Sequence, residues 1–294
     1  MIDVVVQGVL LGGYYAILAA GLAFLYSVMG LFNLAHGSFA VLAAYFVVML
    51  CDALGLDPFL AIALVVLALG VIGVVVERLV FEPSTRGGPL LSVLATFGLS
   101  VVLDNAMFQV FGANTRSLAP YIGDLSWASW ELGDLYVGKL AVITLVAAVA
   151  VLGGLHLFLT HTGLGRAIRA TAQDADTAGL VGIDPRRART IAAAIAFMTI
   201  GLAGAALGMR ATFTPYSGTP QLLFAFQAAV IGGSNSIWGT LIGGIVLGLS
   251  QTIGAEISTQ GFFIAGNLVF FAVLFARLYG GSLRLPALIL KRKV

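Results

Sequence analysis

The sequence predicts an all-α fold, that of a polytopic membrane protein with about 8–9 transmembrane helices, including short or broken segments. Of the 294 residues, 60% are hydrophobic and only 10% are charged, whereas soluble domains average about 25% charged residues. Apolar runs long enough to cross a bilayer recur along most of the chain. These runs are continuous and do not alternate with polar residues, which favours helices over membrane-spanning strands.

Nine apolar segments are expected, with ends placed to within a few residues. They cover roughly 4–29, 38–51, 58–76, 90–111, 140–158, 190–209, 221–233, 239–257 and 262–279. The second and seventh segments are short. No loop between segments exceeds about 30 residues, so we expect residues 1–294 to form a single transmembrane domain. The G-x-x-x-G spacings at Gly8–Gly12 and Gly244–Gly248 are expected to pack helices within the chain.

The distribution of Lys and Arg predicts the orientation of these segments. Basic residues follow the third segment, fill the loop 160–189 and gather again after residue 276, so these regions are expected in the cytoplasm. The loop 112–138 has one basic residue, Arg116, against three acidic residues, and it carries two tryptophans, which fits the outer face. Nine crossings with a cytoplasmic C-terminus place the N-terminus outside; a re-entrant short segment would move it inside.

The loop 160–189, THTGLGRAIRATAQDADTAGLVGIDPRRART, is the longest polar interruption of the chain and holds five of its 15 Lys and Arg residues. Residues 167–180 can form one short amphipathic helix, with Ile168 on the apolar side and Arg169 and Asp174 elsewhere. A short helix between membrane spans suits docking into a groove of a soluble partner. We therefore expect this loop to receive mechanical work.

Two stretches, Gly30–Gly37 and Gly232–Gly239, share the spacing G-x-x-N-x-x-x-G, and each lies beside a short apolar segment. Short or interrupted spans in corresponding halves of a transporter indicate a substrate path. Glycine permits a break, and Asn33 or Asn235 can bond the backbone groups that the break exposes. Two ordinary polar turns explain the pattern equally well. For His36 we favour a side chain satisfied by a backbone carbonyl, and for Asn33 a local structural role.

Asp104 and Asn105 lie inside the fourth segment, and Glu77 ends the third. A carrier driven by an ion gradient could use such an acid. No second acidic residue lies at the depth of Asp104, however, and this weakens an interpretation as a proton- or sodium-coupled carrier.

The sequence offers little for enzyme chemistry. With three histidines and one cysteine, we identify no catalytic residue, no metal site and no nucleic-acid patch. Gly133–Leu140 matches a nucleotide-binding loop except at Leu140, where Ser or Thr is required to hold magnesium, and it falls on the predicted outer face. We therefore expect the chain to bind no cofactor and to have no ATP site of its own.

Three stretches resemble the permeases of branched-chain amino acid ABC importers, of the Liv-H kind in the leucine/isoleucine/valine family. Gly30–Phe39 is similar to that family's G-x-x-N-x-A-H-G element. Gly163–Pro185 resembles its cytoplasmic coupling loop, and Ala228–Gly248 resembles its glycine-rich late segment. The match runs in register over nearly the whole chain.

The resemblance implies an ABC importer transmembrane domain in a bacterial inner membrane, which moves substrate inward using ATP and Mg²⁺ bound on separate subunits. The implied partners are a second homologous permease, two cytoplasmic ATPase subunits, a periplasmic solute-binding protein and the lipid bilayer. The residues implied for the translocation path are Asn33, His36, Gly37 and Asn235. Those implied for ATPase coupling are Arg166, Arg169, Gln173, Asp174, Gly179 and Gly182.

Several alternatives stay open at this point. Related importers carry urea, short amides or aromatic acids through similar permeases, so the cargo and the pairing with a second permease or a second copy are not fixed. A secondary carrier would transport in liposomes without ATPase partners. A membrane scaffold would show no substrate-dependent effect at all.

Overall fold

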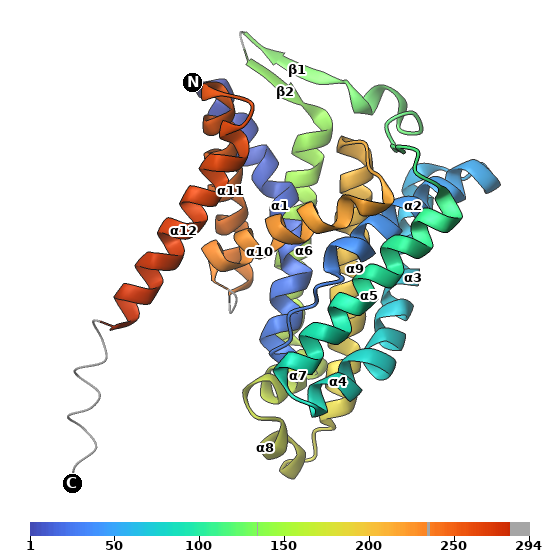
Figure 1. Cartoon of the computed structure of the whole chain (residues 1–294), viewed down its shortest axis with the longest axis vertical. Helices are drawn as coiled ribbons and strands as arrows, with labels where there is room; N and C mark the ends of the chain where they lie inside the picture. Colours follow the sequence, from blue (N-terminus) through green and yellow to red (C-terminus); the bar gives the residue numbers. More distant parts are fainter. Residues whose placement is uncertain (134, 234–235, 283–294) are drawn as a thin grey trace.

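The computed structural model describes residues 1–133, 135–233 and 236–282, and it is built almost entirely from helices (Figure 1). Within these residues, eight helices are long and apolar enough to cross a membrane. The predicted all-α polytopic fold is therefore confirmed. A small antiparallel hairpin, β1 (Ser129–Leu132) and β2 (Leu135–Gly138), projects at one end of the molecule beside the N-terminus (Figure 1).

In chain order, the helices and helical turns are α1 (Ile2–Met29), α2 (His36–Leu54), α3 (Pro58–Val76), the π-helix η1 (Glu77–Phe81), α4 (Glu82–Arg86), α5 (Pro89–Phe111), the 3₁₀ turn η2 (Gly123–Ser126), α6 (Lys139–His161), α7 (Gly163–Gln173), α8 (Ala175–Leu180), α9 (Pro185–Arg210), the 3₁₀ turn η3 (Pro215–Ser217), α10 (Gly218–Gly232), α11 (Ile237–Ile257) and α12 (Gly261–Ser282).

Most predicted segments match these helices within a few residues, but one predicted end was wrong. The second segment, 38–51, matches α2, which at 19 residues is longer than the short segment expected. The third does not end at residue 76, because the helix continues through η1 and α4 to Arg86 as one 29-residue candidate span. The charged residues Glu77 and Arg78 do not end the helix. It ends instead at the glycine pair Gly87–Gly88, where glycine favours helix termination.

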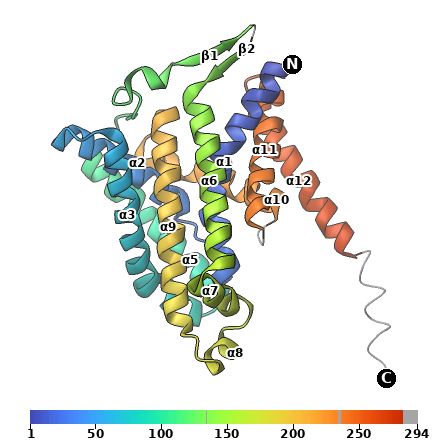
Figure 2. The same ribbon diagram turned by 180° about the vertical axis from the view of Figure 1, so that it is seen from behind.

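The chain runs nine times between the hairpin end and the opposite end, which carries α7 and α8 (Figure 2). Seven passages are helical throughout. The other two, 30–54 and 211–232, each begin with a stretch that is not α-helical and finish as an α-helix, α2 or α10. The eight candidate spans and the shorter α10 together account for the nine apolar segments predicted from the sequence. We call the end with α7 and α8 the arginine-rich end.

The two interrupted passages are alike, and they run in opposite directions. After α1 ends, seven residues separate its last residue, Met29, from Gly37; after α9 ends, seven residues again separate Arg210 from Gly218. The structural equivalent of Gly30–Gly37 is therefore 211–218. The predicted partner, Gly232–Gly239, is instead the close connection from α10 to α11, where Gly232 and Gly239 contact each other.

Helix α1 forms the centre of the assembly, with 89% of its most apolar stretch buried. It packs against α11 through glycines on both helices. A Cβ at Gly8 would lie 2.8 Å from the Leu249 Cα, and one at Gly244 would lie 2.8 Å from the Ala16 backbone nitrogen. The G-x-x-x-G spacings therefore serve packing within the chain, as predicted.

Candidate translocation path and coupling loop

The two interrupted passages meet near the middle of the molecule. His36 Nε2 donates a hydrogen bond to the carbonyl oxygen of Leu18, 2.8 Å away, and Leu18 lies about halfway along α1. The start of α2 there touches the start of α10, because a Cβ on Gly218 would lie 2.7 Å from the backbone nitrogen of Ser38. A Cβ on Gly37 would overlap the carbonyl oxygen of Gly218. Glycine at both positions allows this close approach.

No side chain caps the first residue of α2 or of α10, but α10 continues directly from η3, whose start is closed by a capping box between Thr214 and Ser217. The first N–H groups of a helix have no partner inside the helix, and unsatisfied backbone groups are costly inside a bilayer. The start of a helix also carries partial positive charge. The junction of α2 and α10 therefore brings two helix starts together near the middle of the membrane, the depth at which transporter sites with broken helices occur.

Asn33 and His36 hold the stretch of chain that leads from α1 into this junction. Asn33 is fully buried, and its Oδ1 accepts a hydrogen bond of 3.0 Å from the Ala35 N–H. The Asn33 carbonyl accepts another of 3.2 Å from the His36 N–H. These contacts fit the local roles favoured from the sequence for both residues, whereas Gly37 lies at the junction itself. Asn235 lies outside the described residues.

The loop between α6 and α9 contains two helices and not one. The prediction of a single helix over 167–180 was wrong, because Asp174 ends α7 and caps α8. Its Oδ1 accepts hydrogen bonds from the N–H groups of Asp176 and Thr177, both 3.0 Å long, and the Thr177 hydroxyl donates to Oδ2 over 2.6 Å. These hydrogen bonds, that from the Thr177 hydroxyl above all, hold the pKa of Asp174 below its ordinary value.

The residues predicted for ATPase coupling divide into two groups. Asp174, Gly179 and Gly182 are exposed on α8 and the turn after it, at the extreme arginine-rich end (Figure 1). Gly182 has φ +84°, a left-handed conformation that favours glycine. The second group lies on α7, whose buried side contains Ile168. It comprises Arg166, Arg169 and Gln173.

Arg169 and Gln173 line a cavity of about 670 Å³ between α7 and the neighbouring ends of α1, α6 and α11. Its wall is mostly apolar and includes His156 and Trp238, whose rings lie 6.2 Å apart. Arg166 is exposed and donates a long hydrogen bond, 3.5 Å, to the His161 carbonyl. The structure thus places Arg169 and Gln173 toward the spans, and Asp174 with the two glycines toward the tip of the loop.

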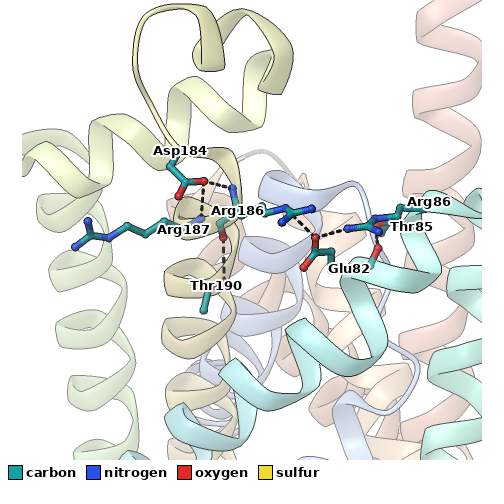
Figure 3. A network of polar contacts seen from close by, with 7 residues as sticks. All are labelled: Glu82, Thr85, Arg86, Asp184, Arg186, Arg187 and Thr190. Atoms are coloured by element: carbon teal, nitrogen blue, oxygen red, sulfur yellow. Dashed lines mark hydrogen bonds and ion pairs between the residues drawn. The ribbon is translucent and has the colours of Figure 1, made fainter.

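A polar network joins the end of this loop to α4 (Figure 3). Asp184 caps α9, because its Oδ1 accepts hydrogen bonds from the N–H groups of Arg186 and Arg187 at 3.0 and 3.3 Å. Arg186 Nε lies 3.0 Å from Glu82 Oε1, and Arg86 Nη2 lies 2.6 Å from the same oxygen. The sequence shows the i, i+4 pair of Glu82 and Arg86, but the contact with Arg186 depends on the packing of distant segments.

The near-match to a nucleotide-binding loop forms part of the hairpin. Gly133 takes a left-handed turn conformation with φ +65°, and Leu135–Gly138 is strand β2, paired with β1. Lys139 begins α6, with its Nζ 5.8 Å from the centre of the Trp130 ring. An extended strand does not turn successive backbone N–H groups toward one phosphate, which agrees with the interpretation of this match as a coincidence.

The fold and the junction of interrupted spans define a helical membrane transport protein. The chain matches the family described as "Branched-chain amino acid transport system / permease component" over residues 4–278, and it therefore belongs to that permease family. The resemblance seen in the sequence is confirmed.

Curated relatives agree with this assignment. The high-affinity branched-chain amino acid transport system permease protein LivH of Salmonella typhimurium is 31% identical over 271 residues, covering 86% of each chain. The LivH protein of Escherichia coli gives the same identity and coverage. The permease protein BraD of Pseudomonas aeruginosa is 28% identical over 262 residues, which is 86% of this chain and 85% of that protein.

Proposed function

We propose that this chain is the membrane-spanning subunit of an importer for branched-chain amino acids, driven by ATP hydrolysed on separate subunits. Two cytoplasmic ATPases, which bind ATP and Mg²⁺, would seat against the loop 160–189. A second homologous permease would complete the passage, and a periplasmic solute-binding protein would deliver the cargo at the hairpin end. The names of the LivH and BraD relatives support the cargo, and the arginine-rich end supports a cytoplasmic location for the loop in an inner membrane.

The observation that carries this proposal is the course of α9. This helix starts directly after the loop, where Asp184 caps it, and ends at Arg210 before the interrupted passage 211–232. Its 26 residues give a rigid element about 39 Å long at 1.5 Å per residue. Displacement of the loop is therefore passed along one helix to the junction with α2. Contact between Arg186 and Glu82 ties α4 to the same movement.

The proposal is tested with the purified complex of permeases and ATPases in liposomes, loaded with a solute-binding protein and radiolabelled leucine. We expect uptake that requires ATP. The variants Asp174→Arg and Gly182→Trp should lower the leucine imported per ATP hydrolysed, because both alter the exposed tip of the loop. Gly98→Ala, on membrane helix α5 where an added Cβ meets nothing within 4 Å, is the control and should behave as wild type.

Two results contradict the proposal. Leucine uptake by the chain without ATPases would identify a secondary carrier. An unchanged ratio of leucine to ATP in both loop variants would show that the loop does not couple hydrolysis to transport. Uptake of urea or an aromatic acid in place of leucine would keep the importer and correct its cargo.

A further inference from the structure

The cavity beside α7 has a cation at one end and no anion to balance it. Arg169 and Gln173 line the cavity, and no acidic residue is among the described residues that line it. The ion pairs among the described residues do not include Arg169. The next acid along the chain, Asp174, uses both carboxylate oxygens on the first turn of α8. The guanidinium group of Arg169 is therefore available to an anion from outside the chain.

The rest of the cavity is mostly apolar and extends along the membrane helices. The α1 wall has small side chains, from Ala20 to Ser27, and the α6 wall includes Leu152. Ala20 lies nine residues before the end of α1 at Met29, and Leu152 lies nine residues before the end of α6 at His161. At 1.5 Å per residue the cavity reaches about 13 Å from these helix ends. Half of the roughly 30 Å hydrocarbon core of a bilayer is about 15 Å, so the cavity has the depth of one lipid leaflet.

The cavity is open to the bilayer between α6 and α11. Both helices pack on α1, and α7 lies at the end of α6 (Figure 2). His156 of α6 and Trp238 of α11 line the cavity and are exposed. Close to them on the same two helices, Leu157 and Ile242 are exposed as well. Apolar side chains of this kind on a span face lipid, whereas a polar side chain such as that of His156 faces a cavity.

The lining residues select a lipid with a particular headgroup. An arginine binds phosphate through paired N–H groups, and the amide of Gln173 adds further donors. The ammonium group of a zwitterionic headgroup would find no carboxylate in this cavity, whereas an anionic headgroup needs none. Basic pockets between membrane helices bind anionic headgroups in other proteins. The volume of about 670 Å³ lies within the range of small-molecule sites, about 300–1,000 Å³.

We propose that this cavity binds an anionic glycerophospholipid from the leaflet at the arginine-rich end. The phosphate group lies at Arg169 and Gln173, and one acyl chain lies between α1, α6 and α11. The lipid then joins α7 to the spans and holds the first helix of the loop 160–189 in place. This inference depends neither on the cargo nor on the ATPase subunits of the proposed function.

Trp238 provides a reporter inside the proposed site. The chain has three tryptophans, and the other two, Trp127 and Trp130, lie at the hairpin end. Replacing both by phenylalanine leaves Trp238 as the single tryptophan of the full-length chain. Bromine atoms on a lipid acyl chain quench tryptophan fluorescence on contact. The reporter protein is placed in phosphatidylcholine vesicles that contain increasing fractions of brominated phosphatidylglycerol, which is anionic, or brominated phosphatidylcholine, which is zwitterionic.

Brominated phosphatidylglycerol should reach half of its maximal quenching at a fraction at least about 5-fold lower than brominated phosphatidylcholine, the effect of one cation near an anionic lipid. Arg169→Gln in the reporter protein should remove this preference. Arg169→Lys should keep most of it, because the charge remains. Arg78→Gln is the matched control, since it removes an exposed arginine at the same end from η1, which does not line the cavity. This control should keep the full preference.

Equal quenching by the two lipids in the reporter protein with Arg169 intact would overturn the inference, and this result does not depend on any variant folding. Absence of quenching by either lipid would overturn it too, because the cavity would then be closed to lipid. A folded Arg169→Gln variant that keeps the preference would show that Arg169 does not bind the headgroup. Failure of the proposed function is a separate result, seen as a lack of ATP-driven leucine uptake by the complex while the lipid preference is present.

Discussion

Substitution of Gly37 by alanine should stop transport, because the added Cβ separates the starts of α2 and α10. The new carbon would lie 2.7 Å from the carbonyl carbon of Gly218 and 2.9 Å from the backbone nitrogen of Leu222, in addition to its overlap with the Gly218 oxygen. All three atoms belong to the backbone, so no side-chain rotation relieves the contact. Overpacking of this kind costs about 1–3 kcal/mol, which makes the closed junction about 5- to 150-fold less populated.

The assay is ATP-driven leucine uptake by the reconstituted complex, together with the midpoint of its thermal unfolding. Gly98→Ala is the matched control, since it places the same group on membrane helix α5 where nothing lies within 4 Å. We expect Gly37→Ala to lose most uptake and to unfold at a lower temperature, and Gly98→Ala to resemble wild type. The reasoning is refuted if the two variants transport equally and have the same midpoint.

Three further predictions concern the network, the turn before α2 and the tip of the loop. Glu82→Arg should lower leucine uptake per ATP, and the double variant with Arg186→Glu should recover part of it by restoring an ion pair worth about 0–1 kcal/mol at a partly exposed site; no recovery in a double-mutant cycle would remove the network from the coupling path. Asn33→Leu should impair uptake more than recovery of the assembled complex, because the lost hydrogen bond to Ala35 lies beside the junction; equal loss of both would indicate a role in folding alone. The lowered pKa of Asp174 means that its cap stabilises α8 above the unfolded value of about 3.9 and that this contribution is lost as pH falls through the lower, folded value. Hydrogen exchange at Asp176 and Thr177, corrected for intrinsic rates, should accelerate over that acidic range, and constant protection would show that the carboxylate does not hold the helix.

Hydropathy was sufficient to place the spans, because crossing a bilayer imposes length and apolarity on each segment. It could not show where a span is interrupted inside the membrane. The stretch 211–218 has Thr214 where Gly30–Gly37 has Asn33, so the polar pattern differs although both follow the end of a long helix at the same distance. The match in spacing at Gly232–Gly239 therefore pointed to the wrong segment.

The coupling loop shows a second limit of reasoning from one sequence. The charge and position of the loop were evident from the sequence. The amphipathic pattern over 167–180 nevertheless favoured one helix, because periodicity does not show that a residue in the middle of the pattern can cap a new helix. The Asp174 carboxylate accepts hydrogen bonds from the N–H groups of Asp176 and Thr177. This side-chain acceptor competes with the backbone carbonyls of the preceding turn, and the helix ends where the pattern would continue it. The contact between Arg186 and Glu82 joins segments far apart in the chain, and only packing brings these together.

The claim on which the account depends most is that the arginine-rich end faces the cytoplasm, where ATPases can act on it. Single cysteines at two exposed positions, Leu180 in α8 and Tyr136 in the hairpin, would be introduced after Cys51 is replaced by alanine. A membrane-impermeant maleimide should label Tyr136→Cys in intact cells with a permeable outer membrane, and Leu180→Cys only after the inner membrane is opened. Labelling of Leu180→Cys in the intact cells would contradict the account.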